Sequence, residues 1–118
     1  MTDASALGPE DAKLVVLARA TRARNGSAEG AAVRDDTGRT YAASTVALAS
    51  LRLSAVQAAV VMAVASGARG LEAAAIVTEE AWPTEEDLAA VHDLGGAGAV
   101  LHLAGPDGTP RASFSAKD

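Results

Sequence analysis

A stretch in the middle of the chain, Leu53–Gly67 (LSAVQAAVVMAVASG), constrains the fold more than any other segment. Its side chains are apolar at nearly every position around a helix, and Gln57 is the main polar interruption. A helix that is hydrophobic on all sides has to be covered by the rest of its domain. Ser54 and Gln57 have the spacing of a capping box, and Gly67 and Gly70 end the run. We therefore expect a buried helix that the other elements wrap.

The composition is typical of one soluble globular domain. Hydrophobic residues make up 49% of the 118 residues, which is enough for one core without cross-links. The formal charge of −5 argues against a nucleic-acid partner. The absence of cysteine excludes disulfides and thiolate metal ligands, and is compatible with a cytoplasmic location. The acidic start lacks the features of a secretion signal, and no apolar run reaches the roughly 20 residues of a membrane span.

Helix and strand signals alternate along the rest of the chain. The expected elements are a helix over 9–24, strands over 28–35 and 39–49, the central helix, a strand over 72–78, a helix over 84–94, and strands over 97–104 and 109–116. This order predicts a three-layer α/β/α domain over residues 9–118, with a central mixed sheet of about five strands and about three helices. Residues 1–8 are expected to form a flexible tail.

The order, spacing and small residues of these elements resemble the cytidine deaminase family. In that family a Gly-Ala-Ala strand follows the first helix, as Gly30-Ala31-Ala32 does here. The next helix opens at Cys-Ala-Glu or His-Ala-Glu, where this chain has Ser54-Ala55-Val56. A later helix opens at Pro-Cys-x-x-Cys, where this chain has residues 83–87, PTEED. The resemblance covers roughly residues 9–110, and it implies the family's fold and a homo-oligomer, either a dimer or a tetramer.

The resemblance also places the family's metal site on particular residues. Zinc deaminases hold the ion with three ligands at two helix N-termini, and a glutamate that is not a ligand moves protons. The ligand positions fall on Ser54, Thr84 and Asp87, and the glutamate falls on Val56. Neutral hydroxyls are poor zinc ligands, and valine cannot move a proton. The resemblance therefore implies a catalytically degenerate member that has lost its zinc and needs no other cofactor.

Further positions belong to the same degenerate pocket. The family reads the ribose with an Asn-x-Glu element, and the matching positions here are Ser44 and Val46. Trp82 precedes Pro83 at the start of the second motif. It could cover the pocket, anchor an interface or pack over the sheet edge. Ser44, Val46 and Trp82 are thus possible ligand or interface contacts.

Other site chemistries are weaker matches to the sequence. Acidic residues that follow the 72–78 strand could hold Mg²⁺ or Ca²⁺, although acids are usual in a first helical turn. His92 and Asp93 are adjacent on one helix and do not face each other. His102 lies in a strand, and no Gly-x-Ser-x-Gly elbow accompanies it. The acidic residues are Glu79, Glu80, Glu85, Glu86 and Asp87.

Several interpretations stay open at this stage. Ser54 and Thr84 are good helix caps, so they also suit an ordinary α/β domain without a site. The favoured hypothesis is a non-catalytic protein that acts by self-association or as an interaction module with a protein partner. One alternative is a divergent nucleoside or cytidine-deaminase-related hydrolase with an unrecognised site. Another is a metal-free module that senses a nucleoside. No membrane or nucleic-acid partner is expected.

Overall fold

The computed structural model describes residues 7–116, so most of the expected tail at 1–8 lies outside the described residues. Its elements are α1 (Pro9–Asn25), β1 (Gly30–Asp35), β2 (Thr40–Ser44), β3 (Val46–Ala47), β4 (Arg52–Leu53), α2 (Ala55–Ala65), β5 (Leu71–Val77), α3 (Glu85–Gly95), the 3-10 helix η2 (Gly96–Gly98), β6 (Val100–Ala104) and β7 (Pro110–Ser115). Among the described residues, no helix is both long enough and apolar enough to cross a membrane.

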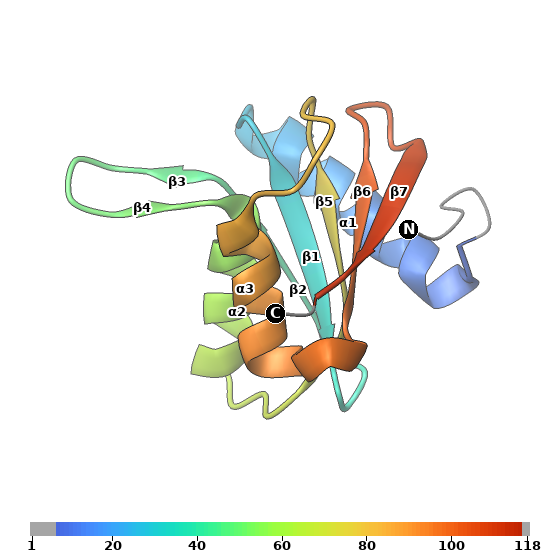
Figure 1. Ribbon diagram of the computed structural model, residues 1–118. Helices are drawn as coiled ribbons and strands as arrows, with labels where there is room; N and C mark the ends of the chain where they lie inside the picture. Colours follow the sequence, from blue (N-terminus) through green and yellow to red (C-terminus); the bar gives the residue numbers. More distant parts are fainter. Residues whose placement is uncertain (1–6, 117–118) are drawn as a thin grey trace.

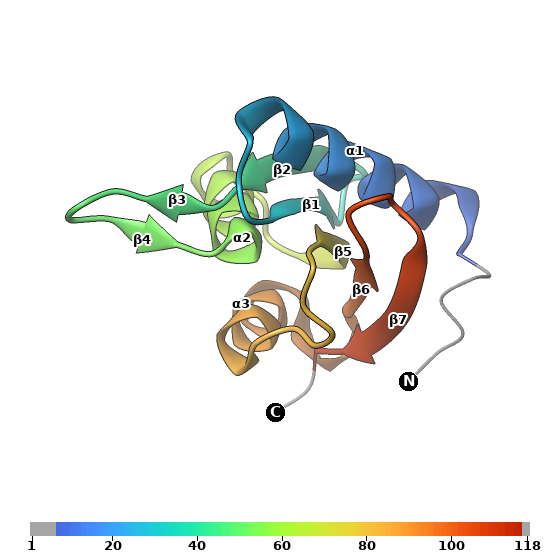
Figure 2. The ribbon, with the colours of Figure 1, turned by 90° about the horizontal axis from the view of Figure 1, so that it is seen from above.

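A five-stranded mixed sheet forms the centre, in the order β2-β1-β5-β6-β7. β1 is antiparallel to both β2 and β5, β5 and β6 are parallel, and β7 is antiparallel to β6. α1 covers one face of the sheet, and α2 and α3 cover the other (Figures 1 and 2). This arrangement confirms the predicted three-layer α/β/α fold.

Alternate residues of the central strands point to opposite helix layers. Ala31 and Ile76 belong to the core beneath α2 and α3, whereas Ala32 and Ala75 belong to the core beneath α1. Small residues in the strands allow the helices to lie close to the sheet. At Gly30 the contact is so close that an added Cβ would stand 2.1 Å from the carbonyl oxygen of Ala18 in α1.

The predicted strand over 39–49 is wrong in its second half. β2 ends at Ser44, and β3 pairs with β4 instead of continuing along β1. A hydrogen bond from the Leu48 amide to the Leu51 carbonyl (2.9 Å) closes the turn between them. Residues 46–53 therefore form a hairpin, called the arm below, which projects from the body in Figure 1. The turn has none of the Gly, Pro, Asn and Asp residues that mark turns most strongly, so the sequence contained little signal for it.

The expectation that α2 is buried on all sides is also wrong. Its Ala55, Val56, Ala59 and Ala63 are buried against the sheet. In contrast, Val61, Met62 and Val64 are 50%, 44% and 53% exposed, respectively. The sheet covers one side of α2 and α3 covers part of another, so a two-helix layer leaves the remaining side to solvent. The helix α2 is thus apolar on all sides but buried on only some of them.

Candidate functional site

The N-termini of α2 and α3 meet at the edge of the sheet where β1 begins and β5 ends. Ser54 caps α2, and its Oγ accepts a hydrogen bond from the Gln57 amide (3.1 Å). The Gln57 side chain accepts one in return from the Ser54 amide (3.0 Å), which confirms the predicted capping box. Thr84 caps α3 by accepting from the Asp87 amide (3.1 Å). Both helices therefore present ordered N-termini at one edge.

The side chain of Asp87 joins the two helices. Its Oδ1 accepts a hydrogen bond from Ser54 Oγ, the cap of α2, at 2.5 Å. Asp87 is almost completely buried. The structure thus brings Ser54, Thr84 and Asp87 together as one hydrogen-bonded cluster. Val56, in the first turn of α2, is fully buried in the apolar core and offers no proton-transfer group.

Glu29, directly before β1, lies beside this cluster, near enough for the charge of Asp87 to affect it, and was missed in the sequence. Its carboxylate accepts a hydrogen bond from the hydroxyl of the buried Thr78 (2.9 Å), directly after β5. Its amide donates to Thr45 Oγ1 (3.2 Å). A charged residue next to the first residue of a buried strand was the available signal. Its proximity to Asp87 depends on the pairing of β1 with β5.

Burial is the main cause of the pKa shifts of Asp87 and Glu29. Burial raises the pKa of Asp87 above its ordinary value of 3.8, and the hydrogen bond from Ser54 partly offsets this. Burial also raises the pKa of Glu29, and the negative charges of Asp87 and Glu80 add to the shift. The cluster therefore holds two carboxyl groups that resist ionisation. Glu29 is only partly buried, so it is the one that a solute could contact.

The cluster does not suit a zinc ion. Zinc ligands lie about 2.0–2.3 Å from the metal, on separate corners of a tetrahedron. Ser54 Oγ and Asp87 Oδ1 are instead hydrogen bonded directly to each other, so no space for an ion separates them. The Ser54 and Thr84 hydroxyls already cap the helices, and neutral hydroxyls are poor donors to zinc. Nothing in this donor set supports chemistry through a metal.

The other residues of the predicted pocket surround the cluster more loosely. Ser44 lies at the end of β2, where its Oγ accepts from the Asn25 side chain (2.8 Å). Val46 lies at the base of the arm, and Thr45 between them contacts Glu29. Trp82 is exposed and packs edge-to-face on Phe114 of β7, with ring centroids 5.8 Å apart. Pro83 follows it and is partly buried.

The acidic loop after β5 does not form a metal centre. Among residues 7–116, no group of three or more His, Cys, Asp or Glu side chains is arranged to hold a metal ion. Asp87 points inward to Ser54, whereas Glu79, Glu80, Glu85 and Glu86 are exposed. The first-turn acids Glu85 and Glu86 suit the helix dipole of α3.

A second polar cluster, under α1, has a composition that resembles a hydrolase triad. His102 Nε2 is 2.8 Å from Asp11 Oδ2, and His102 Nδ1 is 2.6 Å from Ser113 Oγ. Arg34 extends the network by pairing with Asp11 (2.9 Å) and Glu72 (2.8 Å). Ser113 and His102 are buried, so the hydroxyl is closed to a substrate. The network holds α1 against the sheet. Its residues are far apart in sequence, so their spacing did not predict the contact.

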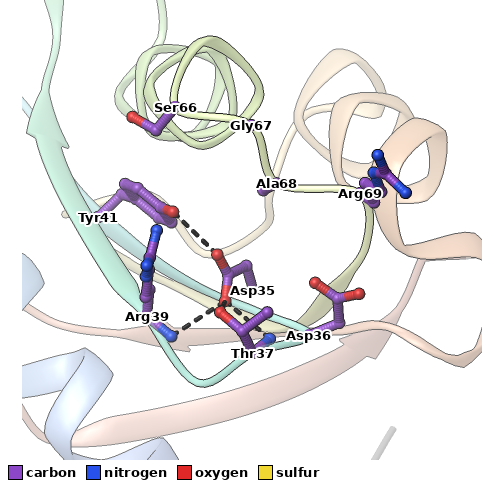
Figure 3. Close-up of a pocket in the computed structure, with 9 residues that line it drawn as sticks. All are labelled: Asp35, Asp36, Thr37, Arg39, Tyr41, Ser66, Gly67, Ala68 and Arg69. Atoms are coloured by element: carbon purple, nitrogen blue, oxygen red, sulfur yellow. Dashed lines mark hydrogen bonds between the residues drawn. The ribbon is translucent and has the colours of Figure 1, made fainter.

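A polar cavity of about 210 Å³ lies at the opposite end of β1, between the β1–β2 turn and the C-terminal end of α2 (Figure 3). The carboxylate of Asp35 lies at its floor. It accepts from the Thr37 hydroxyl (2.7 Å), the Arg39 amide (3.0 Å) and the Tyr41 hydroxyl (2.8 Å). These bonds, the one from Thr37 foremost, lower the pKa of Asp35 to about 2. Asp35 thus stays ionised and holds the turn.

The sheet order and the paired helix N-termini define a class of protein, the α/β/α domains of deaminase type. The chain belongs to the cytidine deaminase-like family, whose family model matches residues 7–108. This confirms the resemblance that its sequence motifs suggested. No curated protein matches the chain in a sequence search.

Solved structures of cytidine deaminases share this fold. A cytidine deaminase from Burkholderia pseudomallei is 26% identical and superposes with a TM-score of 0.76, over 88% of this chain and 91% of that one. The Mycobacterium tuberculosis enzyme is also 26% identical, with a TM-score of 0.64 over 84% and 86% of the chains. The Mycobacterium leprae enzyme is 22% identical, with a TM-score of 0.69 over 93% and 95%, and shows the fold alone.

Replacing Ser54 with alanine should lower the free energy of unfolding by about 3 kcal/mol at neutral pH. The variant loses a helix cap and leaves the Asp87 carboxylate buried without its donor. The pKa of Asp87 is raised in the folded state, so its carboxylate opposes folding as the pH rises through that pKa. The loss from Ser54→Ala should therefore be largest at neutral pH and shrink as Asp87 is protonated.

Urea unfolding at several pH values measures this effect. The matched control is Ser54→Ala in an Asp87→Asn background, where no charge is buried. The loss there should be smaller and independent of acid pH. An equal loss in both backgrounds would show that Ser54 acts only as a cap.

Proposed function

We propose that this protein is a non-catalytic member of its family that acts through association with itself or with a protein partner. The observation that carries the proposal is the hydrogen bond between Ser54 and Asp87, at positions that hold zinc ligands in cytidine deaminases. The two side chains occupy the space between the helix N-termini that an ion would need. At the third ligand position, the Thr84 hydroxyl is already used as the cap of α3.

The buried Val56 supports the same proposal, because it stands where the family has its proton-transferring glutamate. Deamination needs a group that takes a proton from water and delivers it to the leaving amine. A valine in the apolar core cannot do this, even if an ion were supplied. Loss of ligands and loss of the proton shuttle are separate defects, and each is enough to stop the family's reaction.

Two measurements on the purified chain test this proposal. Elemental analysis should find no stoichiometric zinc after the protein is incubated with zinc salt and desalted. A cytidine absorbance assay should show no turnover above buffer, with the Burkholderia pseudomallei cytidine deaminase as the positive control. Stoichiometric zinc or cytidine turnover would overturn the non-catalytic proposal.

If the protein is instead a divergent hydrolase, one residue is the best candidate for its acid–base group. Glu29 is the carboxyl group with a raised pKa that is partly accessible in the cluster, so acid–base chemistry there would depend on it. If turnover of any nucleoside is found, Glu29→Gln should abolish it. Activity that survives this change would place the reaction elsewhere.

The nucleoside-sensing alternative predicts binding without turnover. A ligand at 100 times its dissociation constant adds roughly 2.7 kcal/mol to the free energy of unfolding. A thermal-shift panel of cytidine, uridine, adenosine and guanosine would reveal that gain. We expect no shift, because the positions of the family's ribose-reading element carry Ser44 and Val46, and Ser44 is already bonded to Asn25.

The association that we propose is first of all a homo-oligomer, a dimer or tetramer located in the cytoplasm. The exposed apolar side of α2 and the projecting arm support it. Light scattering after size-exclusion chromatography measures the mass of the assembly, which should exceed one chain.

A further inference from the structure

The polar cavity of Figure 3 lies at the end of β1 opposite to the Ser54–Asp87 cluster, so it is separate from the pocket of the family's reaction. The β1–β2 turn and Tyr41 form one side of the cavity, and the loop from α2 to β5 forms the other. A backbone hydrogen bond from the Asp36 amide to the Gly70 carbonyl (3.2 Å) joins the two sides. The cavity therefore lies between two segments that the fold fixes to each other.

The floor of the cavity is a charged group that the protein holds in place. Asp35 is only 2% exposed. Its carboxylate accepts hydrogen bonds from the Thr37 hydroxyl (2.7 Å), the Thr37 amide (2.9 Å), the Arg39 amide (3.0 Å) and the Tyr41 hydroxyl (2.8 Å). These bonds, with the one from the Thr37 hydroxyl foremost, hold the pKa of Asp35 at about 2, so the floor is negative at neutral pH. A group that is already held in place needs no ordering when a ligand binds.

The two sides of the cavity carry charges of opposite sign. Arg39 lies beside Tyr41 on one side, and Asp36 lies on the opposite side, beneath the Ala68–Arg69 segment (Figure 3). The hydrogen bond to Asp35 raises the pKa of Tyr41, and the guanidinium of Arg39 is near enough to oppose this rise. Within residues 7–116, no ion pair engages Asp36, Arg39 or Arg69. All three are exposed, so a solute can reach them.

The Asp36 side of the cavity has two features that suit a positively charged group. Gly70 leaves room for the Asp36 carboxylate, because a Cβ at Gly70 would stand 3.3 Å from the Asp36 Cγ. Ser66 and Gly67, which directly follow α2, also line the cavity. The carbonyl end of a helix carries partial negative charge and attracts cations. An ammonium group could therefore lie between Asp36 and the end of α2.

The mixture of charges limits the kind of ligand. A simple anion would be repelled by the two aspartates and by the end of α2, and a metal cation would be repelled by the two arginines. In the described part of the chain, no group of three or more His, Cys, Asp or Glu side chains could hold a metal ion. A molecule with separate positive and negative ends meets a partner on each side. The volume of about 210 Å³ is below the roughly 300–1,000 Å³ of pockets for drug-sized ligands, so the molecule must be small.

We propose that this cavity binds a free amino acid as a zwitterion. The carboxylate of the ligand lies on the guanidinium of Arg39, which can hold it by two parallel hydrogen bonds. The ammonium group lies between Asp36 and the carbonyl end of α2, and Arg69 balances the remaining negative charge of Asp35. This site goes beyond the proposed function and does not depend on it, because no residue of the degenerate pocket contributes to the cavity.

An NMR titration of the isotopically labelled full chain tests the site, at low salt because salt screens exposed charges. The probes are glycine, β-alanine and γ-aminobutyrate, which differ in the distance between their charges, with acetate and methylammonium as the two half-ligands. At least one amino acid should saturably shift the amide signals of residues 36–39 and 66–70, and should bind at least about tenfold more tightly than either half-ligand. Equal affinity for acetate or for methylammonium would overturn the zwitterion assignment. No saturable shift with any of the three amino acids would overturn the site itself.

Charge-removing variants give a second readout. Arg39→Gln and Asp36→Asn should each weaken binding of the amino acid at least about tenfold, whereas Arg52→Gln, which removes an exposed arginine from the arm, should leave it unchanged. Gly70→Ala changes no charge but crowds the Asp36 carboxylate, so it should also weaken binding. Circular dichroism melts check that every variant stays folded. Unchanged binding in Arg39→Gln or Asp36→Asn, or an equal loss in Arg52→Gln, would overturn the proposal.

Discussion

A triple variant with Ser54→Cys, Thr84→Cys and Asp87→Cys should bind one zinc ion per chain, whereas the natural chain should bind none. The two helix N-termini already bring these positions together, since Ser54 contacts Asp87 directly and Thr84 caps the turn that carries Asp87. Helix N-termini lower the pKa of cysteine thiols and so favour the thiolate that binds zinc. Structural zinc sites contribute on the order of 10 kcal/mol of binding free energy. The effect should therefore be large.

Elemental analysis and a chelator competition measure this outcome. The thermal midpoint of the triple variant should rise on addition of zinc and fall with chelator, while that of the natural chain should respond to neither. Ser54→Cys alone is the matched control, because a single thiolate at this edge cannot complete a site. A triple variant that folds but takes up no zinc would mean that the backbone, and not only the side chains, has moved away from a zinc-binding arrangement.

Replacing Gly30 with alanine should lower the free energy of unfolding by about 3 kcal/mol. The added Cβ would stand 2.1 Å from the Ala18 carbonyl oxygen and 2.9 Å from the Arg22 amide nitrogen, both in the backbone of α1. A backbone oxygen cannot rotate away as a side chain can, so α1 would have to shift off the sheet. That shift would also strain the Asp11–His102 contact at the other end of the helix.

Urea or thermal unfolding measures the change, and a fall of roughly 10–20 °C in the midpoint is expected for a chain of this size. Gly98→Ala is the control, since a Cβ there meets no atom within 4 Å and its backbone is not left-handed. The control should stay within about 0.5 kcal/mol of the natural protein. If both variants lose the same stability, close packing of α1 on β1 is not the cause.

Local features were predictable because the residues that make them are neighbours in sequence. The capping box at Ser54, the cap at Thr84 and the stop of α1 at Gly26 each need only a few consecutive residues. The resemblance then ordered these elements into the fold that the family match and the solved structures confirm. The strand over 39–49 was the main error, because the turn at Ala49-Ser50 lacks the Gly, Pro, Asn and Asp residues that mark turns most strongly.

The candidate site was predictable only in part. Ser54, Thr84 and Asp87 were named from motif positions, but the hydrogen bond between Ser54 and Asp87 was not expected, since capping rules describe contacts within one helix. Glu29 and Thr78 are 49 residues apart in sequence, and only the pairing of β1 with β5 brings them together. The exposed side of α2 likewise depends on how many helices share its layer.

Sequence patterns alone were enough to locate the three helices and most strands of the sheet, and to show that α2 carries no charged side chain. Caps, turns and hydrophobic periodicity act over a few residues, and they do not depend on the rest of the fold. The folded structure was needed to reveal that Ser54 bonds Asp87 across 33 residues, that Glu29 lies near Asp87, and that one side of α2 faces outward beside the arm. Those outcomes follow from strand order and helix packing, which bring distant residues into contact and leave others uncovered.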